Sequence, residues 1–130
     1  MITVDIVTPT RRLVEGAHAT SVKLPALKGE IEVLPGHTEL ISLLTTGVLT
    51  IAREGKDRKF FLSHGFVEVR KDKVLVLAET VEESKEIDKE RARRAQLKAQ
   101  EVLNSVLPEG QFKKYQLKLQ RALIRQQIAH

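Results

Sequence analysis

The chain has 130 residues, 42% of them hydrophobic, and a formal net charge of +5. It contains no cysteine, which excludes disulfide bonds, thiolate metal sites and catalysis by a cysteine nucleophile. No stretch approaches the roughly 18 consecutive apolar residues of a membrane span, and the first strand pattern starts at Met1 without a signal or transit peptide. Length and composition therefore predict a folded, soluble, cytosol-facing protein without direct membrane insertion.

Short strand patterns, each ended by a turn or a breaker, fill the first part of the chain. Apolar and polar residues alternate from Ile2 to Ile6, and a later segment stops at Pro25. The predicted strands are 2–6, 19–24, 30–34, 48–53, 58–63, 66–70 and 74–81. The segment 40–44 is either a buried strand or one helical turn. This spacing predicts an antiparallel β-sandwich or flattened barrel in residues 1–84.

After Thr80 the hydrophobic period changes from two to about three and a half, which predicts helices. Asp88 is a good N-cap for the first helix, and Pro108-Glu109-Gly110 separates it from the second by about three or four residues. The expected apolar stripes are Ala92, Ala95, Ala99, Val102, Leu103 and Val106, then Phe112, Tyr115, Leu119, Ala122 and Leu123. Residues 85–130 are therefore expected to form an antiparallel helical hairpin.

The contact seam of the first predicted helix is rich in alanine. An alanine buries much less apolar surface than a leucine, so the hairpin is expected to be held weakly. Such a hairpin can leave its docking site and act as a two-state element. The alternative is that small residues only allow the helices to pack closely.

Positive charge is concentrated in the predicted hairpin. Residues 1–80 hold eleven Lys and Arg against ten Asp and Glu, whereas residues 81–130 hold eleven against seven. The last twenty residues contain five cations and no carboxylate. This segment is therefore expected to bind an anionic partner, such as nucleotide, nucleic acid, lipid or an acidic protein.

The sequence offers no constellation of catalytic or metal-ligating residues. It has no phosphate-binding loop, no nucleophile elbow and no histidine pair at metal spacing. Ser63 and His64 would point to opposite faces of a strand, and His37 is expected to be an exposed loop histidine after a tight turn. A small enzyme in the β part is therefore disfavoured.

Several short motifs, in order, resemble the epsilon subunit of the bacterial F-type ATP synthase. They cover nearly the whole chain: Gly29-Glu30-Ile31, Leu34-Pro35-Gly36-His37, Leu40, Thr46-Gly47-Val48, Gly65-Phe66-Val67-Glu68-Val69 and Ile87-Asp88-Lys89-Glu90-Arg91-Ala92. The resemblance implies a sandwich of about ten short strands that joins the gamma subunit to the c-ring in the rotor. It also implies a regulatory hairpin that folds against the sandwich or extends along gamma towards the alpha and beta subunits, where it blocks ATP hydrolysis.

The same resemblance implies a non-catalytic subunit that lies peripherally on the cytoplasmic face of the bacterial plasma membrane. The basic last helix would meet an acidic segment of beta in the extended state. The expected contact residues are Lys113, Lys114, Lys118, Arg121 and Arg125. No cofactor is required for this role.

Members of this family can also bind ATP as a regulatory ligand in the folded hairpin. The residues that match the family's site are Glu82, Ile87, Asp88, Arg91, Ala92, Arg121 and Arg125, with Lys98 where strong binders have an arginine. Arginines four apart share a helix face and suit phosphate oxygens, whereas Lys98 keeps the charge and loses the bidentate fork. The alternative is that Asp88 only caps the helix and Arg91 makes an ion pair.

The loop after residue 29 is expected to face the c-ring. Glu30, Glu32 and His37 form the hypothetical contact patch. Glu32 and Glu39 depart from the family, which usually has glycine and proline there, and both add carboxylate.

A competing interpretation is a basic adaptor that binds nucleic acid through its cationic C-terminal helix. Only five aromatic residues are available to stack on bases, which counts against it. The rotor interpretation expects no nucleic-acid partner.

Overall fold

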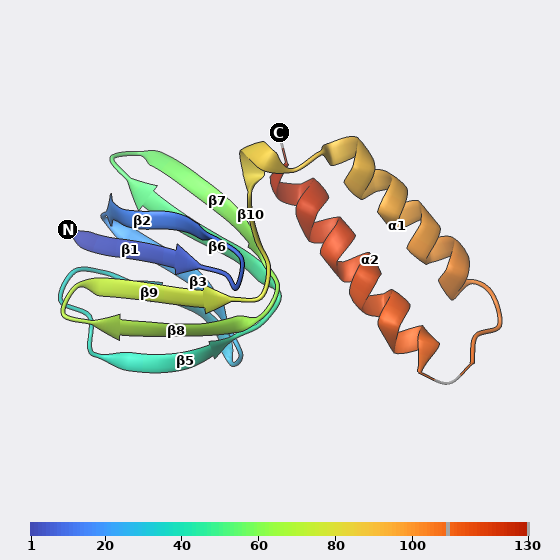
Figure 1. The fold of residues 1–130 in the computed structure, drawn as a ribbon, viewed down its shortest axis with the longest axis horizontal. Coiled ribbons are helices and arrows are strands. Elements are labelled where there is room, and N and C mark those ends of the chain that lie inside the picture. The colour runs from blue at the N-terminus through green and yellow to red at the C-terminus, as the bar shows by residue number, and fades with distance from the viewer. Residues whose placement is uncertain (109, 130) are drawn as a thin grey trace. The chain divides into compact units, whose positions relative to one another are not determined.

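A computed structural model describes residues 1–108 and 110–129, which fall into two compact units. The first unit is Met1–Glu83 and the second is Ser84–His130. Figure 1 shows strands in the first and two antiparallel helices in the second. The predicted fold class, an antiparallel β-sandwich followed by a two-helix hairpin, is confirmed.

Ten strands are present among the described residues. They are β1 (Ile2–Val7), β2 (Arg12–Ala19), β3 (Ser21–Ala26), β4 (Gly29–Val33), β5 (Leu40–Leu44), β6 (Gly47–Arg53), β7 (Lys56–Leu62), β8 (Gly65–Arg70), β9 (Lys73–Ala78) and β10 (Val81–Glu83). The segment left open between strand and helical turn is therefore the strand β5.

All ten strands belong to one sheet, which folds over on itself into two layers (Figure 1). The strand order is β10-β7-β6-β3-β5-β8-β9-β1-β2, with β4 paired to β3. Only the β1–β9 pair is parallel among these pairings. Residues of β1 alternate between buried and half-buried positions, as expected for strands with one face towards a core.

The core lies between the two layers and consists of large aliphatic and aromatic side chains. Ile2, Leu24, Leu49, Phe60 and Leu62 are completely buried in it. Burial of each such side chain contributes about 1.5–3 kcal/mol relative to its exposed state. The first unit is therefore stabilised by an ordinary hydrophobic core.

Three details of the strand assignment from sequence were wrong. The predicted strand 74–81 is interrupted, because β9 ends at Ala78 and β10 begins at Val81. The strand β2 was missed because Gly16, with φ of 62°, interrupts its alternation; its N–H donates to Asp5 Oδ1 at 2.8 Å. Pro25 does not end β3 but lies within it, opposite Glu30. Proline cannot donate a hydrogen bond there, but its carbonyl accepts one from the Thr45 N–H, at 2.8 Å.

The second unit contains a short 3-10 turn, η1 (Ser84–Glu86), and the helices α1 (Lys89–Leu103) and α2 (Gln111–Ile128). The predicted N-cap is confirmed, since the Asp88 Oδ1 accepts a hydrogen bond from the Arg91 N–H at 3.1 Å. The expected connection of three or four residues was too short, because α1 ends at Leu103 and the link covers 104–110. Of the predicted breaker, Glu109 lies outside the described residues.

The helix stripes predicted from sequence were only partly correct. Ala92, Ala99 and Ala122 are buried, but Ala95 is exposed. Tyr115, Leu119, Val102 and Leu103 are half-buried, whereas Val106, Phe112 and Leu123 are exposed. Val106 is exposed because it lies beyond the end of α1. The buried part of the hairpin helices is thus made of alanines.

Candidate functional site

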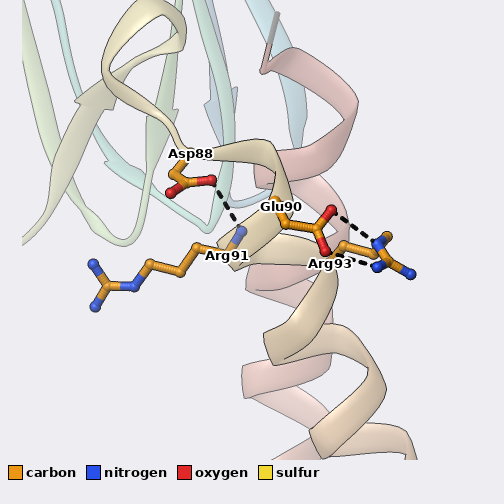
Figure 2. Close-up of polar contacts among 4 residues, drawn as sticks. All are labelled: Asp88, Glu90, Arg91 and Arg93. Atoms are coloured by element: carbon orange, nitrogen blue, oxygen red, sulfur yellow. Dashed lines mark hydrogen bonds and ion pairs between the residues drawn. The ribbon is translucent and has the colours of Figure 1, made fainter.

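The predicted ATP motif lies where the chain enters α1. Ile87 is buried and its N–H donates to the Ser84 carbonyl at 3.2 Å. Asp88 is exposed and occupied as the helix cap. The exposed Arg91 side chain extends away from the helix (Figure 2) and has no ion pair or side-chain hydrogen bond within the described part of the chain. The arginine of the motif therefore keeps its full set of donors.

On this turn of α1 the ion pair joins Glu90 and Arg93 and does not involve Arg91, the arginine of the motif. Arg93 Nη2 and Nε donate to both carboxylate oxygens of Glu90, at 2.7 Å and 3.2 Å (Figure 2). These hydrogen bonds hold the pKa of Glu90 below its ordinary value of 4.5, and they raise the pKa of Arg93. The alternative that Arg91 makes a hairpin ion pair is therefore wrong.

The arginines of α2 lie closer to the protein interior. Arg121 and Arg125 are both half-buried and lie one turn apart. Arg121 Nε is buried and has no hydrogen-bond partner in residues 1–108 and 110–129. A buried donor without an acceptor is unfavourable by about 1–3 kcal/mol. This atom is therefore chemically suited to an incoming acceptor oxygen.

One hydrogen bond fixes the register of the two helices. Gln126 Nε2 donates to Gln96 Oε1 at 2.5 Å, which places the C-terminal part of α2 beside the first half of α1. Arg125 is next to Gln126, so its level on the hairpin falls between those of Arg91 and the exposed Lys98. Arg125 therefore lies beside the middle of α1, whereas Arg91 lies near the start of that helix.

Glu82 belongs to the first unit, whereas the arginines of the predicted ATP site belong to the second. It is a half-buried residue of β10, opposite Phe61 of β7, in the first unit. Its neighbour Glu83 accepts two hydrogen bonds from Arg58, at 2.9 Å and 3.0 Å, which raise the pKa of Arg58. The Arg58 guanidinium also lies 5.4 Å from the Phe60 ring centroid. This anchor fixes the last strand before the hairpin begins.

The three lysines expected to meet the beta subunit are exposed on α2. Lys118 Nζ lies 4.9 Å and Lys114 Nζ lies 5.9 Å from the ring centroid of Tyr115. In these cation–π contacts the alkyl chains of the two lysines lie beside the ring, while their charged ammonium groups stay accessible. Lys113 has no such ring contact.

The residues expected to face the c-ring lie on β4 and the turn after it. Glu30 and Glu32 are two apart, exposed, and therefore on the same face of β4. His37 is half-buried rather than exposed, with Nδ1 at 2.7 Å from the Thr38 carbonyl oxygen. Its turn is closed by a hydrogen bond from the His37 N–H to the Leu34 carbonyl at 3.0 Å.

The structure also contains an apolar surface that the sequence did not predict. Leu43 lies opposite Phe66, Phe66 opposite Leu77, and Leu77 opposite Val7. We call this set the apolar row: Leu43, Phe66, Leu77 and Val7, on one outer face of β5, β8, β9 and β1. Leu43 is 61% exposed and Phe66 is 40% exposed.

A further exposed apolar residue, Ile41, flanks the row on β5 and is 75% exposed. The sequence signal for this surface was present but ambiguous. In 40–44 both faces of a strand would carry apolar residues, Leu40 and Leu44 on one face and Ile41 and Leu43 on the other. The pattern therefore does not distinguish an inner from an outer face. Only the register of β5 against β8 assigns Ile41 and Leu43 to the outside.

Two family profiles together match the whole chain. Residues 1–84 match the ATP synthase delta/epsilon chain, beta-sandwich domain, and residues 85–130 match its long alpha-helix domain. The chain belongs to the ATP synthase delta/epsilon chain family. It is accordingly an ATP synthase subunit of the delta/epsilon type.

Curated relatives agree with this membership. The ATP synthase epsilon chain of Trichlorobacter lovleyi is 40% identical over 126 residues, which cover 96% of this chain and 91% of the relative. That of Carboxydothermus hydrogenoformans is 46% identical over 102 residues, covering 78% and 75%. The resemblance to epsilon chains is thus confirmed, and the comparisons give the nucleic-acid adaptor no support.

Two solved assemblies contain chains with the same fold. A chain of the Euglena gracilis mitochondrial ATP synthase (OSCP/F1/c-ring) superposes with a TM-score of 0.87 at 21% identity, covering 99% of this chain and 81% of that chain. A chain of the Tetrahymena thermophila central stalk/c-ring structure has a TM-score of 0.66 at 11% identity, covering 99% and 96%. At these identities the likeness concerns the fold.

Within the described residues, no helix has both the length and the apolar character needed to cross a membrane. Within the same residues, no three His, Asp or Glu side chains are grouped so that they could hold a metal ion.

Proposed function

We propose that this chain is a non-catalytic rotor subunit and couples the gamma subunit to the c-ring at the cytoplasmic face of the bacterial plasma membrane. The observation that carries this proposal is the apolar row, since a face of large exposed side chains is the usual mark of a protein interface. The two solved assemblies that contain chains of the same fold, one of F1 with a c-ring and one of a central stalk with a c-ring, support the same role.

The apolar row suits a lasting contact with gamma. Its four residues lie on adjacent strands in one line, and in the next line along the same face Glu68 separates Ile41 from the half-buried Leu75. The line after that is charged, with Arg70 opposite Lys73. The apolar row is therefore bordered on this side by charged residues, as the apolar part of an interface commonly is.

Binding to isolated gamma tests this assignment. Leu43→Asp and Phe66→Asp place a charge in the row without touching the buried core, so we expect gamma to bind at least about tenfold more weakly. Leu34→Asp is the matched control, because Leu34 is also exposed, at 50%, but lies in the turn between β4 and β5. Equal affinities for all three variants, measured by calorimetry, would contradict the assignment.

We assign the contact with the c-ring to Glu30, Glu32 and His37. The two carboxylates share a face of β4, and they can meet amide or cationic groups in the polar loops of the ring. Glu30→Gln combined with His37→Ala should reduce rotor assembly and proton-driven ATP synthesis. Unchanged synthesis and assembly would show that another surface meets the ring.

The hairpin is proposed to regulate hydrolysis by leaving the folded state. Its buried helix residues are alanines, so few side-chain contacts oppose a rearrangement. In the extended state Lys113, Lys114, Lys118, Arg121 and Arg125 would meet an acidic segment of beta. Replacement of the three lysines by glutamine should relieve inhibition of ATP hydrolysis, and more so at low salt.

We further propose that the folded hairpin binds ATP as a regulatory ligand. The residues present fit a polyphosphate, because Arg91 has free donors and Arg121 Nε is a buried donor without an acceptor. Arg125 and Lys98 add charge beside the middle of α1, and Glu82, Ile87, Asp88 and Ala92 complete the family's set. A ligand selective for the folded hairpin stabilises it by about 2.7 kcal/mol at a hundredfold excess over Kd.

Calorimetric titration of the full chain with ATP tests this site. Arg91→Ala and Arg121→Ala should each abolish most of the binding heat, whereas Arg94→Ala should not, since Arg94 is an exposed arginine of α1 outside the motif. Lys98→Arg should tighten binding, because a guanidinium can bind phosphate with two parallel hydrogen bonds. Binding heat that persists in both Arg91→Ala and Arg121→Ala would contradict the proposed ATP site.

A further inference from the structure

The turn between β8 and β9 has an unusual backbone. Lys71 has φ of 48° and Asp72 has φ of 60°, so two successive non-glycine residues are left-handed. A two-residue hairpin turn requires this conformation, and Asn-Gly or Gly-Gly adopts it with less strain. The closing pair is Arg70 opposite Lys73. An aspartate at the second position therefore has a function other than ease of turning.

Asp72 makes two hydrogen bonds to segments that are distant in sequence. Its carbonyl oxygen accepts from the Thr3 N–H at 2.8 Å, at the start of β1. Its side-chain Oδ1 accepts from the Gly36 N–H at 2.7 Å. The first bond needs only the main chain, whereas the second needs a carboxylate or amide at this position.

Gly36 lies in the middle of the Leu34–His37 turn. It has φ of 82°, a left-handed conformation that favours glycine, and nothing lies within 4 Å of the position that a Cβ would take. The turn has one internal hydrogen bond, from His37 to Leu34. The bond to Asp72 therefore ties this exposed turn to the rigid β8–β9 hairpin, and a charged acceptor makes it a strong one.

We propose that Asp72 is the positioning residue of the Leu34–His37 turn. It holds the main chain at Gly36 and so sets where His37 is presented. The role in c-ring contact rests on the proposed function, but the positioning itself does not. The strained turn at Lys71-Asp72 is kept because the aspartate side chain is needed at this point.

Amide hydrogen exchange of the full chain, followed by NMR, tests the positioning. In Asp72→Gly the turn conformation becomes easier but the acceptor is lost, so the Gly36 amide should exchange about five to ten times faster. In Lys71→Gly the turn is relieved equally and the acceptor stays, so the Gly36 amide should be unchanged. Asp72→Asn should also retain it, since an amide oxygen can accept the same bond.

The Thr3 amide is an internal control, because its acceptor is the main-chain carbonyl of residue 72. It should stay protected in all three variants. The proposal is overturned if Gly36 exchange is unchanged in Asp72→Gly, or if Thr3 and Gly36 lose protection together, since the side chain would then act only through the turn.

Binding to the purified c-ring separates this inference from the proposed function. Asp72→Gly should bind more weakly than Lys71→Gly, and His37→Ala should also bind weakly. If His37→Ala binds normally while Gly36 exchange is faster in Asp72→Gly, the positioning holds and the c-ring contact fails. If His37→Ala weakens binding and Gly36 exchange does not respond, the contact holds and the positioning fails.

Discussion

The two units of this chain are stabilised in different ways. The first buries large side chains such as Phe60 and Leu49 completely, while the helices of the second bury only Ala92, Ala99 and Ala122. Since stabilisation follows the apolar area removed from water, a contact between alanines contributes much less than one between leucines. The sandwich, for which the rotor contact is proposed, is therefore the more rigid unit. The hairpin, for which a movement is proposed, is the more weakly packed one.

The largest expected effect is a core truncation in the sandwich. Phe60→Ala removes a fully buried ring and its contact with Arg58, so it should destabilise the first unit by about 3–5 kcal/mol. Phe112→Ala, in α2, is the control, because its ring is 52% exposed and its loss should change stability by about 0.5 kcal/mol or less. Denaturant unfolding of both full-length variants measures the difference. Similar losses would contradict the comparison between the units.

Enlarging one seam alanine tests the hairpin. Ala99→Leu forces a larger side chain into the closest part of the helix contact and should destabilise the hairpin by about 1–3 kcal/mol. Ala95→Leu is the matched control, because Ala95 lies one turn away on the same helix and is exposed. Thermal melts followed by circular dichroism at the helix wavelength compare them. A larger loss in Ala95→Leu would show that the seam is assigned to the wrong face.

The Arg58–Glu83 pair tests how the two units are joined along the chain. Glu83→Gln removes the charge from a pair that is 43% exposed on the arginine side and 11% on the glutamate side, so β10 should be destabilised by about 1–2 kcal/mol. Amide exchange in β10 should become faster. Asp57→Asn, on the exposed part of β7, should leave it unchanged. If amide exchange in β10 were unchanged in Glu83→Gln, the Arg58–Glu83 pair would not anchor this strand.

The smallest effect is expected at Glu90. Its pKa is lowered in the folded hairpin by hydrogen bonds from Arg93, so the pair stabilises α1 above about pH 4.5. That contribution is lost as the pH falls through the lowered pKa. Helix content of the wild type should therefore decline slightly below pH 4.5, and less so in Glu90→Gln. Glu101→Gln, on the same helix, should behave like the wild type.

Much of the architecture could be predicted because it depends on local periodicity. The change of period after Thr80, the cap at Asp88 and most strands follow from neighbouring residues. The β2 strand was not predicted because Gly16 breaks its alternation of apolar and polar residues. The end of β3 was placed too early, at Pro25, although the proline carbonyl can still accept a hydrogen bond within a strand. Helix stripes failed at Ala95, because periodicity does not reveal which half of an apolar helix face meets its partner.

The sequence by itself determined the fold class, the family and the positions of the cationic residues, since each is encoded in residues close together or in ordered motifs. Tertiary structure alone decided the apolar row, whose four residues come from four strands and meet only through strand register. It also decided the bond from Gly36 to Asp72, which joins residues 36 positions apart. Contacts of this kind depend on how distant segments pack, and no local pattern specifies them.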